Sequence, residues 1–256
     1  MYSKENVKPL HLQLNSSPTI SCISLADDAA LLANTELDLS DLLFLTIQYC
    51  KKYNVELVPE KTQLIVFPHH NDLAVRASKS SINLSLNGIT LVPSEEVSHL
   101  GVQRSEVPTN VCSILDRISA HRKQLHSLLP DGVALPHGGN PASNLKVDSI
   151  YCLPVLLSGL ASLLLSKSEV NKLNQCYKTN LTRLMKLCDN TPDCALYFLA
   201  GTLPCEAHLH LHQLALFSMI CRLKDNIFYE LARSSFLGTV NVSHTWFDQI
   251  RLLCIE

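Results

Sequence analysis

The chain has 256 residues, of which 46% are apolar, and a formal net charge of −2 at pH 7. This length and apolar content allow a buried core in one or two domains, and the near-neutral charge argues against strong nonspecific binding of nucleic acid by the whole molecule. The ten cysteines include no Cys-x-x-Cys pair, which argues against a small disulfide scaffold. No apolar signal segment follows Met1, so we expect an intracellular protein of the nucleus or cytoplasm with reduced cysteines.

Two adjacent carboxylates near the N-terminus are the most informative feature of the chain. Asp27 and Asp28 stand between short, partly alternating apolar runs at residues 20–26 and 29–33, a pattern that predicts a strand, a tight turn and a second strand. Charge repulsion and partial burial there are costly, and a divalent cation held by carboxylate oxygens, Mg²⁺ or Mn²⁺, removes that cost. Two alternatives remain open, because adjacent acids are also typical of the first turn of a helix and of an ordinary polar turn.

A helix and a strand are expected next along the chain. Apolar residues at helical spacing predict a helix over residues 35–53, with Thr35 and Asp38 in an N-cap arrangement. The β-rich run that follows Lys61 predicts a strand beginning near Thr62.

The clearest hairpin signal by composition lies at residues 81–92. Apolar and polar residues alternate before Asn87-Gly88, and this dipeptide supplies the positive φ angles of a type I′ turn. A further strand is expected over residues 96–102, which contain the sequence His-Leu-Gly.

Helical periodicity replaces strand alternation from Thr109 onward. Residues 130–144 hold three prolines and three glycines, so we expect a loop there. Thr191 and Pro192 are expected at the N-cap and first position of a helix that Gly201 ends. Helices are expected over residues 109–128, 149–166, 168–188, 191–201 and 203–223. The apolar stripe of the first helix is Val111, Ile114, Leu115, Ile118, Leu125 and Leu128.

Residues 149–166 carry no charged side chain. Their length of about 18 residues reaches the lower limit for spanning a bilayer. Pro154, Gly159 and several serines dilute the run, and no aromatic belt flanks it. We therefore expect a buried core helix and no membrane partner.

Three histidines near the start of the last predicted helix suggest a metal site. His208 and His212 share a helical face, and His210 and Cys205 lie nearby. No standard zinc-ligand spacing closes this set, so we expect no structural zinc.

The order of these features resembles the reverse transcriptases of non-LTR, LINE-type retrotransposons. The Ala-Asp-Asp hairpin is similar to motif C of that family, Lys61-Thr62 to its motif D, and His99-Leu100-Gly101 to its motif E.

The likeness extends over about residues 17–253, since residues 153–161 and 195–207 also resemble segments of these proteins. Asn54 stands where motif D usually has Gly, and Val58 where it usually has Asn.

The resemblance implies an α+β fold in which residues 1–105 form a partial palm, with a small antiparallel sheet, and residues 106–256 form a helical thumb/connection region. It also implies that Asp27 and Asp28 are catalytic and hold Mg²⁺ or Mn²⁺, with an RNA template and a DNA primer as partners. Lys61 would donate a proton to the pyrophosphate leaving group, for which a solvated turn lysine is the alternative.

The resemblance further implies a primer grip at His99, Leu100 and Gly101, acting mainly through backbone placement. Nine basic and six acidic side chains give residues 106–190 a net charge of +3. That charge suits helices that touch a phosphate backbone, and a scatter of solvated charges explains it equally well. The residues expected to bind nucleic acid are Arg117, Arg122, Lys123, Lys172 and Lys178.

The resembled family also uses an aspartate from an earlier strand, motif A, whereas Asp27 is the first aspartate here and Glu5 the only earlier acid. Motif B and the basic fingers segment are likewise absent. We therefore expect the chain to be incomplete for RNA-directed DNA synthesis alone and to need an N-terminal palm and fingers segment. The alternatives are a noncatalytic, retroelement-derived helical protein that binds nucleic acid or a partner chain, and a fragment without a stable fold, because a missing strand leaves an open sheet edge.

Overall fold

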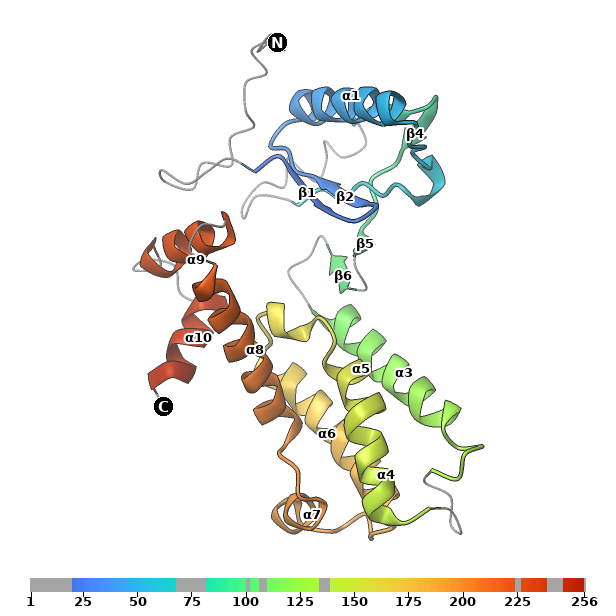
Figure 1. Cartoon of the computed structure of the whole chain (residues 1–256), viewed down its shortest axis with the longest axis vertical. Helices are drawn as coiled ribbons and strands as arrows, with labels where there is room; N and C mark the ends of the chain where they lie inside the picture. The colour runs from blue at the N-terminus through green and yellow to red at the C-terminus, as the bar shows by residue number, and fades with distance from the viewer. Residues whose placement is uncertain are drawn as a thin grey trace. The chain divides into compact units, whose positions relative to one another are not determined.

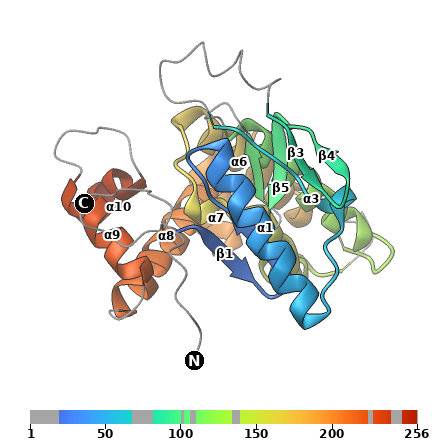
Figure 2. The ribbon, with the colours of Figure 1, turned by 90° about the horizontal axis from the view of Figure 1, so that it is seen from above.

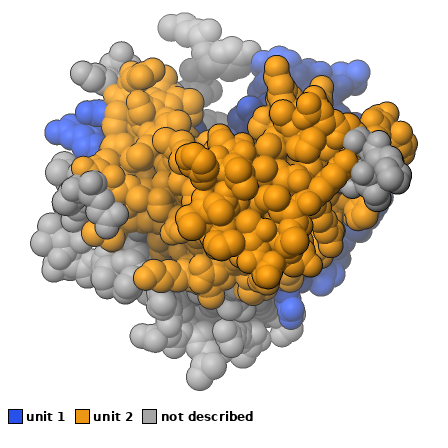
Figure 3. Space-filling model, turned by 90° about the horizontal axis from the view of Figure 1, so that it is seen from below, with its two compact units in different colours: residues 1–100, 104–108, 225–234 blue, residues 101–103, 109–224, 235–256 orange. Residues whose placement is uncertain are grey.

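The computed structural model describes residues 20–67, 82–99, 102–105, 110–133, 139–223, 227–238 and 246–255. The chain divides into two compact units, which Figure 3 colours separately. Unit 1 comprises residues 1–100, 104–108 and 225–234, and unit 2 comprises residues 101–103, 109–224 and 235–256. The described residues are mostly helical with small antiparallel sheets, in agreement with the α+β class.

Strands β1 (Cys22–Leu25) and β2 (Asp28–Leu31) form an antiparallel hairpin in unit 1 (Figure 1). Leu25 pairs with Asp28, so the connecting loop has only two residues. The predicted strand, turn and strand are confirmed, and the alternative that a helix begins here is wrong.

Helix α1 (Glu36–Tyr53), the long helix of unit 1 in Figure 2, has a suitable residue at each end. Thr35 Oγ1 accepts a hydrogen bond from the backbone N–H of Asp38 at 3.2 Å, which confirms the predicted N-cap. Asn54 ends the helix in the left-handed conformation, with a φ of 54°. Gly and Asn are the residues that usually occupy this position.

The strand predicted near Thr62 is wrong. A short 3₁₀ helix, η1 (Pro59–Lys61), is followed by an isolated bridge between Leu64 and Pro93. The carbonyl of Leu64 accepts a hydrogen bond from Ser94 N–H at 2.8 Å, but Pro93 has no N–H with which to extend a ladder. Leu64 is therefore buried, although the β-rich run to which it belongs forms no strand.

Strands β3 (Leu84–Leu86) and β4 (Ile89–Leu91) form the second predicted hairpin. Asn87 and Gly88 have φ angles of 51° and 81°, as a type I′ turn requires. The hairpin and α1 share the small core of unit 1. The buried members of this core are Leu64, Leu84, Leu86 and Leu91, with Leu39, Leu43, Ile47, Leu57 and Ile82 packed against them.

The strand predicted over residues 96–102 is confirmed as far as His99. Strand β5 spans Glu96–His99 and strand β6 spans Val102–Ser105.

Helix α3 (Val111–Ser127) buries a narrower apolar face than the sequence predicts. Val111 and Leu115 are exposed, and the polar side chain of His121 lies on the buried face instead. The members of the predicted stripe that are buried are Ile114, Ile118 and Leu125.

The loop predicted at residues 130–144 is too long, because helix α4 (Pro141–Val147) begins inside it. Asn140 Oδ1 accepts a hydrogen bond from Ala142 N–H at 2.9 Å. Pro141 occupies the first helical position, where a backbone N–H would have no intrahelical partner.

The single helix predicted over residues 149–166 is broken into several pieces. Helix α4 runs into the π-helical turn η3 (Asp148–Cys152), which is followed by α5 (Leu153–Leu157). Gly159, with a φ of 76°, then turns the chain into the 3₁₀ helix η4 (Leu160–Ser162).

By length and composition alone, Pro141–Ser162 could cross a membrane, and 33% of its most apolar window is buried. A core helix meets the same criterion. Leu153, Leu156 and Leu157 lie in the main core of unit 2, so the predicted burial holds for part of this run.

Helix α6 (Lys167–Met185) begins with a complete capping box. Ser166 Oγ accepts a hydrogen bond from Glu169 N–H at 3.4 Å, and the Glu169 carboxylate accepts one from Ser166 N–H at 2.7 Å. The buried apolar residues of α6 recur at helical spacing and are Val170, Leu173, Tyr177, Leu181 and Leu184.

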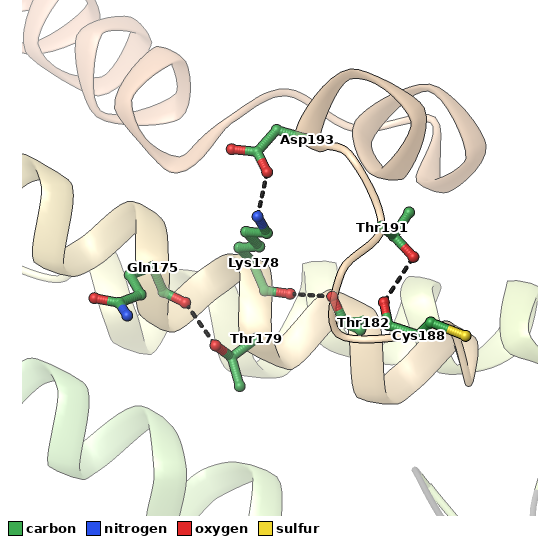
Figure 4. Close-up of polar contacts among 7 residues, drawn as sticks. All are labelled: Gln175, Lys178, Thr179, Thr182, Cys188, Thr191 and Asp193. Carbon is green, nitrogen blue, oxygen red and sulfur yellow. Dashed lines mark hydrogen bonds and ion pairs between the residues drawn. The ribbon is translucent and has the colours of Figure 1, made fainter.

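Helix α7 (Asp193–Ala200) ends at Gly201, as predicted, with a φ of 61°. Its predicted N-cap is wrong, because Thr191 Oγ1 donates to the carbonyl of Cys188 at 2.7 Å (Figure 4). Pro192 occupies the N-cap position and has no side-chain acceptor to offer.

Helix α8 (Cys205–Arg222) is the last of the predicted helices, and α9 (Ile227–Gly238) and α10 (Trp246–Ile255) follow it. Trp246 Nε1 donates to the carbonyl of Ala161 at 2.8 Å, which ties α10 to η4. The main core of unit 2 consists of Ile114, Ile118, Leu153, Leu156, Leu157, Leu160, Leu163, Leu165, Val170, Leu173, Tyr177, Leu181, Leu196, Cys205 and Leu209.

Two glycines provide a matched test of this packing. A Cβ on Gly159 would lie 2.6 Å from Val102 Cγ2, whereas a Cβ on Gly201 would meet nothing within 4 Å. Both have a positive φ, so alanine costs about 1 kcal/mol in backbone strain at either position. Because valine is stiff about χ1, we expect Gly159→Ala to lower the free energy of unfolding by about 2 kcal/mol more than Gly201→Ala does.

Urea denaturation of the two variants measures this difference. Adding Val102→Ala to Gly159→Ala should recover part of the loss. Equal losses in the two single variants would contradict the close approach of Val102 to Gly159.

Candidate functional site

The tip of the β1–β2 hairpin holds the two predicted metal ligands. Asp27 is the second loop residue and Asp28 is the first residue of β2. Ala26, just before them, has a φ of 52°. This left-handed conformation is uncommon for a residue with a Cβ, and such strained positions cluster at functional sites. The hairpin therefore keeps two adjacent carboxylates at a tight turn.

Both carboxylates are exposed rather than partly buried, so water weakens the repulsion between them. No group of three or more His, Cys, Asp or Glu side chains that could hold a metal ion is found among the described residues. Magnesium can bind through one or two carboxylates while it keeps several waters. The hairpin tip can thus supply part of an oxygen-ligand set for Mg²⁺ or Mn²⁺.

The other residues implied by the resemblance lie on neighbouring elements of unit 1. Lys61 ends η1 and is exposed, as expected of a solvated turn lysine. His99 ends β5 and is half-buried. The remaining predicted primer-grip residues, Leu100 and Gly101, lie outside the described residues.

The five basic residues predicted to bind nucleic acid have different surroundings. Lys178 of α6 forms an ion pair at the start of α7 (Figure 4). On α3, Lys123 is exposed and Arg117 is half-buried. The structure brings two of the five, Arg122 and Lys172, to one groove in unit 2.

This groove lies between α3 and α6 and has a volume of about 590 Å³. Arg122 from α3 and both Lys172 and Arg183 from α6 line it, together with His121 and Asn180. Arg183 was not among the predicted residues. It shares a face with Lys172 because the two are three helical turns apart.

Buried polar groups lie on the inner side of the groove. His121, Asp148 and Asn180 are each at most 3% exposed. Asn180 Nδ2 donates to Asp148 Oδ1 at 2.5 Å and lies 3.5 Å from His121 Nε2. His121 Nδ1 lies 3.8 Å from Cys176 Sγ. One amide group therefore joins η3, α6 and α3.

These contacts determine the protonation of the buried groups. An ionised carboxylate can only accept hydrogen bonds, so the amide nitrogen of Asn180 faces Asp148. The same nitrogen donates to His121 Nε2, and the proton of the neutral imidazole is therefore on Nδ1. Burial lowers the pKa of His121 to about 4, and the charge of Arg122 acts in the same direction. Burial raises the pKa of Asp148 to about 6, which hydrogen bonds from Asn180 and Cys152 partly offset. At neutral pH the histidine is neutral and the aspartate is charged.

One histidine of α8, His208, takes part in packing contacts. His208 Nε2 lies 3.1 Å from Thr202 Oγ1, and its ring meets the ring of Tyr177 edge-on. Burial lowers the pKa of His208, with a further contribution from His212. His208 thus joins α8 to α6.

Sequence reasoning missed the buried polar groups because their partners come from distant parts of the chain. One signal was present: His121 has helical spacing with Ile118 and Leu125, so it falls on the apolar face of α3. Its partner Asn180 lies 59 residues further on.

Comparison of the chain with protein-family models, with curated protein sequences and with solved structures gives no match in any of the three.

The burial of His121 and Asp148 predicts a characteristic pH dependence of the free energy of unfolding. The lowered pKa of His121 gives stability that is present above pH 6.5 and is lost as the pH falls toward 4. The raised pKa of Asp148 gives stability that is present below about pH 4 and is lost as the pH rises through 6. The two slopes oppose each other between pH 4 and 6.

In Asp148→Asn only the pH dependence that His121 causes remains. We therefore expect its free energy of unfolding to rise, relative to that of the native chain, by about 2 kcal/mol between pH 4.5 and 6.5. His121→Gln should show the opposite slope. Urea denaturation at several pH values measures both differences, and parallel curves for the three proteins would contradict the burial of the pair.

Proposed function

We propose that this chain is the C-terminal part of a non-LTR, LINE-type reverse transcriptase, with a partial palm followed by thumb/connection helices. The parent reaction is RNA-directed DNA synthesis by two-metal nucleotidyl transfer, in which one ion activates the primer hydroxyl and both stabilise charge on the transferred phosphate. Asp27 and Asp28 hold Mg²⁺ or Mn²⁺, and the partners are an RNA template and a DNA primer.

The observation that carries the proposal is the β1–β2 hairpin. A two-residue loop keeps Asp27 and Asp28 adjacent and exposed at its tip, where an incoming cation and a phosphate can approach without first displacing packed side chains. A two-residue hairpin loop requires a positive φ at its first position, and alanine, with its Cβ, holds this conformation at Ala26 with some strain.

A second observation concerns one of the two residues that depart from motif D. Asn54 has a φ of 54°, so its position calls for Gly or Asn. The replacement of the usual Gly by Asn therefore preserves the backbone geometry. This departure from the family pattern does not weaken the resemblance.

The metal site is incomplete in the part of the chain that the structure describes, since no third acid joins Asp27 and Asp28. A third carboxylate, the role of the motif A aspartate, has to come from outside the described residues. We accordingly propose that the chain alone binds divalent cations weakly and does not extend primers. A palm and fingers segment carrying motif A is the partner that would complete the site.

Paramagnetic Mn²⁺ provides the test, because it broadens the NMR signals of nearby amides. In the ¹⁵N-labelled full chain we expect the amides of residues 26–29 to broaden first, with a dissociation constant on the order of 1 mM. Asp27→Asn should abolish the selective broadening. The matched control Asp41→Asn removes an exposed acid of α1 and should leave the broadening unchanged.

Broadening that is uniform over the acidic surface, or that survives Asp27→Asn, would refute a metal site at the hairpin. If the chain also bound RNA in a salt-dependent way that Asp27→Asn left unchanged, the noncatalytic, retroelement-derived binding protein would be the better assignment.

A further inference from the structure

The groove between α3 and α6 has features of a ligand site that are independent of the hairpin carboxylates. Its walls are two facing helical surfaces within unit 2. Residues spaced three and four apart on α6, from Lys172 to Arg183, form one wall, and residues from Leu115 to Leu125 on α3 form the other. Its volume of about 590 Å³ lies within the range of small-molecule sites.

The charged side chains that line the groove are all cationic. Arg122 comes from α3, and Lys172 and Arg183 come from α6; no Asp or Glu lines the groove. None of the three has an ion-pair partner among the described residues. The acid Asp148 accepts a hydrogen bond from the lining residue Asn180 and does not itself line the groove. Three unpaired cations facing one hollow favour an anion with two or three negative charges.

The α3 wall also carries apolar side chains. Ile118 and Leu125 are buried, and Leu115 is an exposed apolar residue beside them. An apolar surface next to cations suits a ligand with a flat ring at one end and phosphate groups at the other. Inorganic phosphate alone would leave this surface uncovered.

We propose that the α3–α6 groove binds a small phosphorylated molecule of nucleotide size, such as a nucleoside diphosphate. Its phosphates lie between Arg122, Lys172 and Arg183, and its base covers the exposed Leu115 of α3. This site is separate from the proposed polymerase metal site, and the two stand or fall on different measurements.

A small ligand suits the groove better than a nucleic-acid strand. A strand needs cations spread along several phosphates, and one basic residue beside the groove is not available for such a contact. Lys178 is neutralised by Asp193, and the whole chain carries a net charge of −2. The three cations that have no ion pair in the described part of the chain instead line one groove.

The test is a titration of the full-length ¹⁵N-labelled chain with ADP. We expect saturable shifts of α3 and α6 amides, and a dissociation constant that Arg183→Gln and Lys172→Gln each raise about tenfold, because each removes one charge-assisted hydrogen bond. The matched control Lys146→Gln removes an exposed lysine of α4 and should leave the affinity unchanged. Pyrophosphate should bind more weakly than ADP.

Three outcomes would overturn the proposal. They are the absence of saturation up to about 5 mM ADP, an equal loss of affinity in Lys146→Gln, and a single-stranded RNA that binds the groove more tightly than ADP. All the substituted side chains are exposed, so the variants should fold, and an unchanged far-UV spectrum and unfolding midpoint check this. None of these outcomes bears on Mn²⁺ binding at Asp27.

Discussion

One buried amide determines how the helices of unit 2 align. Asn180 donates to Asp148, which is 2% exposed, and lies beside the equally buried His121. An ionised carboxylate without a donor costs several kcal/mol in such a place. A shift of α6 by one turn along α3 would separate these groups, so the contact sets the register of the two helices. The relative positions of the cations that face the groove follow from that register.

The geometry of unit 1 depends on local turn chemistry instead. Ala26, Asn54 and Asn87 all adopt a positive φ, and each stands where the chain reverses or leaves a helix. The small core around Leu86 then holds α1 against the second hairpin. The candidate metal ligands are thus placed by a backbone conformation, whereas the groove in unit 2 is placed by buried polar contacts.

This contrast explains what the sequence could predict. The Asn87-Gly88 turn and the Thr35 cap involve residues at most three apart, and both were predicted correctly. The strand near Thr62 failed because its outcome depends on Pro93, a distant residue that cannot extend a ladder. The position of Asp27 in a hairpin was likewise predictable from neighbouring residues. The exposure of its side chain, in contrast, depends on which elements cover it. The groove needed the pairing of α3 with α6, which no spacing within one helix reveals.

The exposure of the first hairpin connects its stability with its proposed chemistry. Ile23 and Leu25 are 39% and 61% exposed, and within the described residues β1 and β2 pair only with each other. A two-stranded hairpin is marginally stable by itself. A further strand carrying an acid would pair one of the open edges, cover the apolar side chains and add the third carboxylate. Metal affinity at the tip and order in the hairpin would then rise together, because both are limited by the same unpaired edge.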